Sequence, residues 1–426
     1  MPQPKPFTFE PPQAAIDDLR RRIRATRWPD QIENIGWDFG VERTELKKVA
    51  IHWADSFDFT AQFARLNAFP NFTTTVSGDS VPLHFIHVRS DRADAKPLLL
   101  IHGWPGSVIE FFDIIPLLTR PKSDTAPAFH LVIPSLPGYG FSPAPTRSGV
   151  STLEMARAFN QLMIQLGYIK YFAQGGDWGS IIARDLAVHH ALNCVGIHIN
   201  MAAFQPPRTA TWIPSLVAMY ANKGTYVLSP EEWEWVKETQ KHQETGTGYM
   251  HYQTTAPQAL AYGLNDSPVG LLAWIYEKFY RWTHHLGDVT QAVPIDKILL
   301  NVSIYWFTNT IASSLRLYRE TLGKKNPGTN LDGTVVLRNT HSNGVLIHLK
   351  CSVITAKIAN PVGVAVFPKE LYKAPKSWVK HYTNLQHWTV MNRGGHFAAL
   401  EEPALLADDI QECFGKWVAD GLVKLD

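Results

Sequence analysis

The chain has 426 residues, of which 45% are hydrophobic and 18% are charged, so it can bury a sizeable core in one large domain or two. Its 40 basic and 38 acidic residues give a formal net charge of +2, which offers no electrostatic reason to bind nucleic acid or an anionic membrane surface. The 14 tryptophans, 14 tyrosines and 21 phenylalanines indicate either an aromatic-lined cavity or a bulky core.

Cysteine content and the absence of long apolar runs bear on location. Cys194, Cys351 and Cys413 are far apart and form no CxxC pair, a pattern typical of a reducing compartment rather than of a disulfide framework or a zinc site. The start of the chain, MPQPKPFTFEPPQ, lacks the apolar region of a signal peptide, and no apolar run approaches the roughly 20 residues of a membrane-spanning helix. We therefore expect a soluble, cytoplasmic protein.

The first predicted elements are a helix and a hairpin. Residues 14–29 predict a short helix, and its acidic and basic side chains one turn apart, such as Asp18 and Arg22, indicate a solvated face of ion pairs rather than an anion site. From about residue 70, TTTVSG and VPLHFIHV flank GDS and predict a β-hairpin. We assign residues 1–90 to an N-terminal segment that wraps the core.

Strands and helices then alternate. The apolar runs in KPLLLIHGWPG, HLVIP and YFAQ read as buried strands, and each precedes a turn and a helical pattern. Ser107 with Glu110, and Ser151 with Glu154, predict capping boxes at two of the helix starts. This rhythm predicts an α/β fold with a mostly parallel sheet, and residues 91–205 form the first part of its core.

The remaining chain divides into an insertion and a return to the core. Residues 206–345 are rich in Trp and Tyr and contain helical patterns such as PEEWEWVKETQKH, without strand–helix alternation, so we predict an inserted helical lid. Residues 346–426 resume the sheet at PVGVAVFPKE and close with HWTVMNRGGHFAALEEP and a final helix.

The motif GGDWGS, residues 175–180, carries the first chemical signal. Its G-x-D-x-G frame is that of a nucleophile elbow, a tight strand-to-helix turn that exposes one side chain, normally a serine. Here the exposed residue is Asp177. An isolated Asp on a turn is more often a helix cap, so the motif needs partners elsewhere in the chain before it predicts catalysis.

Two downstream residues complete a catalytic set in the chain order of α/β-hydrolases. His396 lies in the glycine-flanked loop of GGHFAALEEP, and Glu370 ends an apolar strand 26 residues before it. A loop histidine or a strand-end glutamate alone is usually solvated. Together with Asp177 they predict a nucleophile, a base and the acid that orients the base.

The chemistry follows from the carboxylate nucleophile. A carboxylate suits displacement at a saturated carbon, such as that of an epoxide or a carbon–halogen bond, and gives an alkyl ester of Asp177. His396, oriented by Glu370, then activates water to hydrolyse the ester. HGWPG places the backbone N–H of Trp104 after a buried strand, where it can face the N–H of Trp178 and form an oxyanion hole.

The sequence resembles the microsomal-type epoxide hydrolases, the branch with an extra N-terminal segment. The resemblance runs almost end to end, through RWPD, GWDFG, HGWPGS, LPGYGFS, GGDWGS, NDSPVGLLAWIYEKF, FPKELYKAPKSWV and RGGHFAALEEP. It implies an α/β-hydrolase core with a helical lid, conversion of a small apolar epoxide and water to a vicinal diol without a cofactor, and a homodimer. Mammalian members carry an N-terminal membrane anchor that has no counterpart in this sequence.

The resemblance also implies two lid tyrosines that hold and protonate the epoxide oxygen. They correspond to Tyr249, in GYMHYQ, and Tyr318, in SSLRLYRE, with Tyr252 as a rival for the first position. Tyr318 and Glu370 lie 52 residues apart, which is more than the family pattern predicts. The surplus falls at 333–360 and is either a surface excursion or translated non-coding sequence that disturbs the return to the core.

Other readings remain open at this point. A haloalkane dehalogenase shares the aspartate nucleophile but needs N–H donors for halide, and a protein that only binds an apolar ligand has no need of all five catalytic side chains. Metal catalysis is disfavoured because His189–His190 and His284–His285 are adjacent pairs, and neighbouring residues on a helix do not share a face. The sequence contains no phosphate-binding glycine motif.

Overall fold

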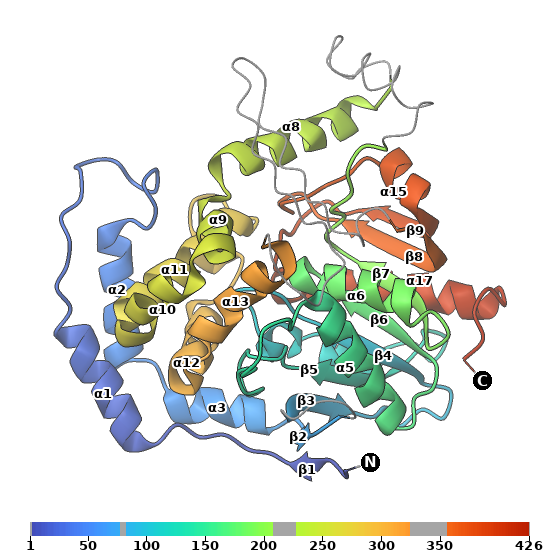
Figure 1. Cartoon of the computed structure of the whole chain (residues 1–426), viewed down its shortest axis with the longest axis horizontal. Helices are drawn as coiled ribbons and strands as arrows, with labels where there is room; N and C mark the ends of the chain where they lie inside the picture. Colours follow the sequence, from blue (N-terminus) through green and yellow to red (C-terminus); the bar gives the residue numbers. More distant parts are fainter. Residues whose placement is uncertain (1, 77–81, 208–226, 324–355, 426) are drawn as a thin grey trace.

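The computed structural model describes residues 2–76, 82–207, 227–323 and 356–425. These residues form a nine-stranded sheet in the order β1-β2-β3-β5-β4-β6-β7-β8-β9 (Figure 1). The strands are β1 Lys5–Pro6, β2 Asn71–Thr74, β3 Leu83–Val88, β4 Lys96–Ile101, β5 Phe129–Pro134, β6 Tyr171–Gly175, β7 Cys194–Ile199, β8 Ile358–Val366 and β9 Thr383–Val390.

The type of strand pairing changes once across the sheet. The pairs β1–β2, β2–β3 and β3–β5 are antiparallel, and every pair from β5 through β4, β6, β7 and β8 to β9 is parallel. The predicted hairpin is therefore present as β2 and β3, although residues 77–81 at its tip lie outside the described residues. This is the expected α/β-hydrolase sheet, mostly parallel with an antiparallel edge.

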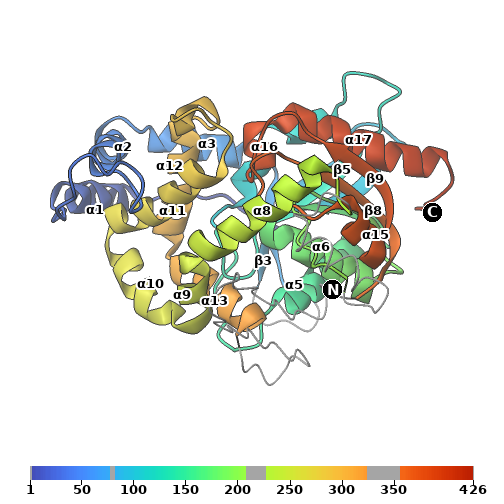
Figure 2. The same ribbon diagram turned by 90° about the horizontal axis from the view of Figure 1, so that it is seen from above.

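Helices cover both faces of the parallel part, which explains why its strands are continuous apolar runs. Residues Leu98 to Ile101 of β4 are fully buried. Helices α5 and α6 pack on one face, and α4, α16 and α17 lie on the other (Figure 2). Together with η1 and α15, the helices of this part of the chain are η1 Val108–Phe111, α4 Ile115–Thr119, α5 Thr152–Gln165, α6 Asp177–His189, α15 Lys376–Tyr382, α16 Ala398–Glu401 and α17 Pro403–Ala419.

A second group of helices lies beside the sheet and above the ends of its central strands (Figures 1 and 2). It consists of α8 Pro230–Thr245, α9 Gly248–Thr255, α10 Pro257–Asp266, α11 Pro268–Trp282, η3 Val289–Gln291, α12 Ile295–Thr308 and α13 Ile311–Leu322. All of these helices fall within residues 206–345, the stretch predicted to be an inserted lid. Residues 208–226 and 324–355 lie outside the described residues, and so does nearly all of the surplus segment 333–360.

The N-terminal helices α1 Gln13–Arg24, α2 Arg43–Asp55 and α3 Phe59–Asn67 pack against α11 and α12. The indole Nε1 of the buried Trp53 donates to Ser303 Oγ at 2.9 Å, and Trp37 stacks on Tyr280 with ring centroids 3.6 Å apart. The outer face of α1 carries the predicted ion pairs, including one from Arg22 to Asp18 at 2.6 Å.

Neither predicted capping box is complete: in the Ser107–Glu110 box only the bond from the Ser107 N–H to the Glu110 carboxyl is present. The Ser107 hydroxyl does not cap η1 but donates to Asn301 Oδ1 at 2.8 Å. Helix α5 does begin after Ser151, but the Ser151 side chain makes no cap, and Glu154 pairs with nearby arginines instead. A complete capping box occurs at Ser229 and Glu232 of α8, where the sequence analysis had not looked for one.

Two further observations concern the cysteines and the length of the helices. Cys194 and Cys413 are buried free thiols, whereas Cys351 lies outside the described part of the chain. No helix within the described ranges is both long and apolar enough to cross a membrane.

Candidate active site

Asp177 stands on a sharp turn between β6 and α6. Its backbone φ of +47° is in the left-handed region, which a non-glycine residue adopts only when the surroundings hold it there. The glycine frame makes the turn possible: a Cβ at Gly179 would lie 2.0 Å from the carbonyl oxygen of Ile101, and one at Gly175 would lie 2.3 Å from that of Gly179. The motif therefore folds as an elbow that presents a carboxylate at the ends of the parallel strands.

The loop after β4 brings a backbone donor to this carboxylate. The N–H of Trp104 donates to Asp177 Oδ1 at 2.7 Å. His102 fixes the loop, because its Nδ1 lies 3.0 Å from the Gly103 carbonyl and its Nε2 accepts from the Leu136 N–H at 3.1 Å. Burial lowers the pKa of His102 to about 4, so the ring is neutral and makes both bonds as a single tautomer.

His396 and Glu370 meet Asp177 from two other loops. His396 lies between β9 and α16, and Glu370 follows β8. The His396 Nδ1 lies 2.7 Å from Glu370 Oε1, and its Nε2 lies 3.4 Å from Asp177 Oδ2. The His396 N–H also donates to the Trp282 carbonyl of α11 at 2.9 Å, so a lid helix helps to hold the base loop.

The electrostatics of His396 depend on its two carboxylate neighbours. Burial alone lowers the pKa of this ring, but the charge of Glu370 and the bonds to Asp177 and Glu370 outweigh burial and raise the pKa well above its ordinary value. With Asp177 ionised, the imidazole therefore holds its proton more tightly than a free histidine does.

Two tyrosines from the lid face the nucleophile across a cavity of about 60 Å³. Tyr249 comes from α9 and Tyr318 from α13, and both line this cavity with Asp177, Trp178 and Tyr372. Burial raises the pKa of Tyr249 and of Tyr318 well above the usual value, so both phenols are neutral donors. Tyr252, the rival, is 46% exposed and does not line the cavity.

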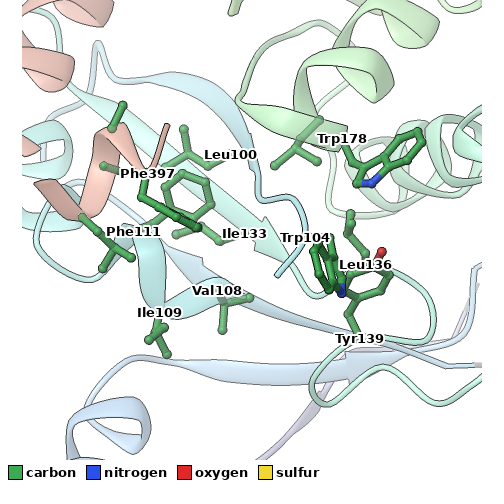
Figure 3. Close-up of a cluster of buried hydrophobic side chains, with 14 of the residues drawn as sticks. Leu100, Trp104, Val108, Ile109, Phe111, Ile133, Leu136, Tyr139, Trp178 and Phe397 are labelled. Carbon is green, nitrogen blue, oxygen red and sulfur yellow. The ribbon is translucent and has the colours of Figure 1, made fainter. Parts of the chain in front are cut away.

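Aromatic rings fix the two phenols in place. Tyr249 stacks on Trp104 with centroids 5.4 Å apart, and Tyr318 meets Trp178 edge to face at 4.8 Å. Figure 3 shows the loop carrying Trp104 next to Tyr139, with Trp178 at the start of α6. The buried Lys278 ammonium lies 4.5 Å from the Tyr249 ring centroid, where a cation favours negative charge developing on the ring.

Several lining residues were missed by the sequence analysis. Glu110, Gln174 and Asn200 line a second cavity that also includes Asp177, and none of the three lines the cavity of the tyrosines. Glu110 had been read as half of a capping box, and nothing in the sequence pattern marked Gln174 or Asn200. Each comes from a different loop or strand end, so only the folded chain brings them together.

The side chains of the pair His284–His285 have structural partners. His284 Nδ1 accepts from the Gly394 N–H at 3.0 Å, and His285 Nε2 lies 2.6 Å from the Tyr280 carbonyl. Within the described residues, no group of three or more His, Cys, Asp or Glu side chains is arranged to hold a metal ion.

Comparison with known proteins agrees with this arrangement. Residues 4–111 match the family model described as the epoxide hydrolase N terminus, and residues 96–225 match the model of the alpha/beta hydrolase fold. Epoxide hydrolase 1 of Sus scrofa is 36% identical over 96% of this chain and 88% of its own length. The chain belongs to the epoxide hydrolase family. Juvenile hormone epoxide hydrolase 1 of Ctenocephalides felis is 33% identical over 95% of this chain and 84% of its own length.

Solved structures of the family superpose over nearly the whole chain. Juvenile hormone epoxide hydrolase of Bombyx mori matches with a TM-score of 0.86 and 31% identity, covering 98% of this chain and 96% of its own. The Aspergillus niger epoxide hydrolase matches with a TM-score of 0.80 and 33% identity, covering 97% of each chain. A haloalkane dehalogenase from Bradyrhizobium elkani shares the fold, with a TM-score of 0.53 at 16% identity. The protein is therefore a hydrolase of the epoxide hydrolase family.

Proposed function

We propose that the protein converts epoxides to vicinal diols through an alkyl ester on Asp177. The observation that carries the proposal is the placement of a carboxylate, rather than a hydroxyl, between a buried His396–Glu370 pair and two neutral phenols. A carboxylate attacks saturated carbon without a base, and the phenols supply the proton that the opened ring requires.

The first step forms the ester. A carboxylate oxygen of Asp177 attacks one ring carbon, and the C–O bond to that carbon breaks. Tyr249 and Tyr318 share the developing alkoxide through their hydroxyls, and one of them transfers its proton. Their raised pKa keeps both hydroxyls protonated before attack. The cavity beside them is lined mainly by apolar and aromatic side chains, which suits a small apolar epoxide.

The second step hydrolyses the ester. Esterification removes the negative charge of Asp177, which is one of the causes that raise the pKa of His396. The pKa of the ring then falls, so His396 becomes able to accept a proton from water. Glu370 continues to hold Nδ1, and the N–H donors of Trp104 and Trp178 receive the oxyanion that forms on the Asp177 carbonyl oxygen. These steps use no cofactor.

Haloalkane dehalogenation is the nearest alternative because it uses the same nucleophile. It would leave Tyr249 and Tyr318 without a role, since a departing halide takes no proton. A protein that only binds an apolar ligand would have no use for the His396–Glu370 pair against Asp177.

Steady-state assays separate the three functions. The purified protein should release diol from an aryl epoxide such as styrene oxide and release no halide from 1-bromobutane or 1-chlorobutane. Asp177→Asn should lose at least about 1,000-fold in kcat/KM, because the nucleophile is removed. Halide release without diol formation would establish the dehalogenase instead, and absence of turnover with binding of both ligands would establish the binding protein.

A further inference from the structure

A second, smaller cavity adjoins the carboxyl of Asp177. Its volume is about 20 Å³, and its lining includes Asp177, His396, Glu110, Gln174 and Asn200. A site of roughly 10–15 Å³ is enough to hold one water molecule, provided that polar groups surround it. This cavity therefore has the size of a single water site, and it adjoins both the nucleophile and the base.

Its polar lining contains buried atoms without a protein partner. The Oε1 of Gln174, which is 1% exposed, makes no hydrogen bond within the protein, and the Nε2 of His396, which is 4% exposed, has only the long contact of 3.4 Å to Asp177 Oδ2. Gln174 cannot turn to use this oxygen elsewhere, because its Nε2 donates to Asn200 Oδ1 at 2.9 Å. Once Asp177 is esterified and the pKa of His396 has fallen, Nε2 becomes an acceptor, so the enclosed site then offers an acceptor nitrogen and an acceptor oxygen to a ligand that donates hydrogen bonds.

Glu110 supplies a further polar group to the cavity. The Glu110 carboxyl packs against the backbone of Gly106. It can do so because glycine has no side chain: a Cβ at Gly106 would lie 1.3 Å from Glu110 Oε1. Burial raises the pKa of Glu110 to about 8, and the Asp177 charge also raises it, while His396 and the Ser107 N–H lower it. The neutral carboxyl can therefore stand beside the nucleophile without repelling it. Phe111 and Phe397 form an apolar wall, and Figure 3 shows them side by side.

We propose that this cavity holds the water that hydrolyses the ester and that Glu110 orients this water. The inference rests on the proposed function, because it names the source of water for its second step. Neither the phenol side of the site nor the substrate cavity of about 60 Å³ includes Glu110. Substrate therefore occupies one side of the Asp177 carboxyl and water approaches from the other.

The chemical step balances as follows. The water donates one hydrogen to His396 Nε2 and the other to the Glu110 carbonyl oxygen, so its lone pair points at Cγ of Asp177. The O–H bond to His396 breaks, that proton moves to Nε2, and an O–Cγ bond forms. The tetrahedral intermediate then collapses, the Cγ–O(alkyl) bond breaks, and the diol oxygen takes the proton back from His396. The Asp177 carboxyl is left protonated, and it loses this proton as the tyrosinate of the first step regains one. Glu110 keeps its own proton throughout, and its hydroxyl is the donor available to the Gln174 oxygen that lines the same cavity.

The test measures the two half-reactions separately. Rapid mixing of excess enzyme with styrene oxide, followed by intact-protein mass spectrometry, gives the rate at which the adduct forms and the rate at which it decays. Glu110→Leu keeps the side-chain bulk but removes the acceptor, so adduct decay should slow by at least about tenfold. Adduct formation should stay within about threefold of wild type, because the first step uses no water.

Two further variants distinguish water orientation from a structural role. Glu110→Gln keeps a carbonyl acceptor, so its adduct should decay faster than that of Glu110→Leu. Asp185→Asn is the matched control: Asp185 is a fully buried carboxyl on α6 whose pKa burial raises to about 7, but it does not line the cavity, and both rates should be unchanged.

The inference would be overturned if Glu110→Leu hydrolysed its adduct at the wild-type rate. It would also be overturned if formation and decay slowed together in both Glu110 variants, since that result indicates general disturbance of the site. If no adduct formed in any variant or in wild type, the proposed function itself would fail, and the inference with it.

Discussion

At the scale of single residues, the account depends on Asp177 and His396 acting in different half-reactions. His396 takes no part in the first attack, yet the ester cannot be hydrolysed without it. We therefore predict that His396→Gln still forms the alkyl-enzyme but slows its breakdown by about 100-fold or more. Intact-protein mass spectrometry after mixing with epoxide should show nearly complete conversion to the adduct. Equal loss of adduct formation and breakdown would contradict this division of roles.

The tyrosines provide a second test at this scale. Removing one hydroxyl leaves the other as sole donor to the alkoxide, so Tyr249→Phe and Tyr318→Phe should each slow adduct formation by roughly 10- to 100-fold. The double substitution should lower it further.

Tyr252→Phe is the control for both tyrosine variants, because Tyr252 lies three residues from Tyr249 on the same helix but is 46% exposed. Its adduct should form at the wild-type rate in the rapid-mixing assay. A large effect at Tyr252 with none at Tyr249 would reverse the assignment.

How far the sequence specifies the site can be judged residue by residue. Asp177, His396 and Glu370 lie in loops marked by glycine or by a strand end, and the structure brings the three together. Glu110 could not be found in this way. Its spacing from Ser107 fits a capping box, and the sequence gives no sign that the Ser107 hydroxyl bonds to Asn301 or that Glu110 lines a cavity with Asp177.

At the scale of elements, a buried polar cluster joins three parts of the core. Asp409 of α17 lies 2.8 Å from the Nε2 of His198 in β7 and 2.8 Å from the Nε2 of His387 in β9. Burial alone raises the pKa of Asp409, but the bonds to these two histidines outweigh it and lower the pKa well below its ordinary value. The carboxylate therefore stabilises the folded state as long as it is ionised.

We predict that Asp409→Asn lowers the free energy of unfolding at pH 7 by roughly 3 kcal/mol, because the buried hydrogen bonds then lose their ionised acceptor. Because the folded-state pKa is depressed, this stabilisation is fully present above the unfolded-state value of about 4 and is lost as the pH falls below it. The gap in melting temperature between wild type and variant should therefore be large at pH 7 and narrow below pH 4. A gap independent of pH would contradict the assignment.

The sequence predicted elements correctly where the hydrophobic pattern was strong. It predicted a helix cap wrongly where the cap competed with other contacts of the same side chain. The apolar run at residues 98–101 became the buried strand β4, because both of its faces are covered. The capping box predicted at Ser151 did not form, although the helix starts there, because the Glu154 carboxylate forms ion pairs with Arg147 and Arg157 instead.

At the scale of the whole molecule, the N-terminal helices support the lid rather than standing apart from it. Trp53 of α2 is fully buried and bonds to Ser303 of α12, the helix that also supplies Asn301 and Tyr305 to the loop after β4. Helix α12 thus contacts both the N-terminal segment and the loop that carries Trp104, and it connects the two.

We predict that Trp53→Ala lowers the free energy of unfolding by about 3–5 kcal/mol, because it opens a large cavity at this junction. Thermal denaturation should show the loss as a lower melting temperature. Ile51→Ala, on the exposed side of the same helix with 58% of its surface accessible, is the control and should change little. Equal melting temperatures for wild type and Trp53→Ala would show that the junction is not needed for stability.

The overall architecture was largely predictable from the sequence, but the strand order at the antiparallel edge of the sheet was not. Alternation of strands and helices predicted the parallel sheet. Nothing in the pattern indicated that β3 pairs with β5 rather than with its neighbour in sequence, β4, because strand order depends on long-range packing.

The central claim is that Asp177 becomes covalently bonded to the substrate carbon, and one turnover in oxygen-18 water tests it most directly. With enzyme in excess over epoxide, the account predicts that the first diol carries unlabelled oxygen from the Asp177 carboxyl, while one labelled oxygen remains in the peptide that contains this residue. Diol labelled in the first turnover, with no label in the protein, would mean that water attacks the epoxide directly and would contradict the account.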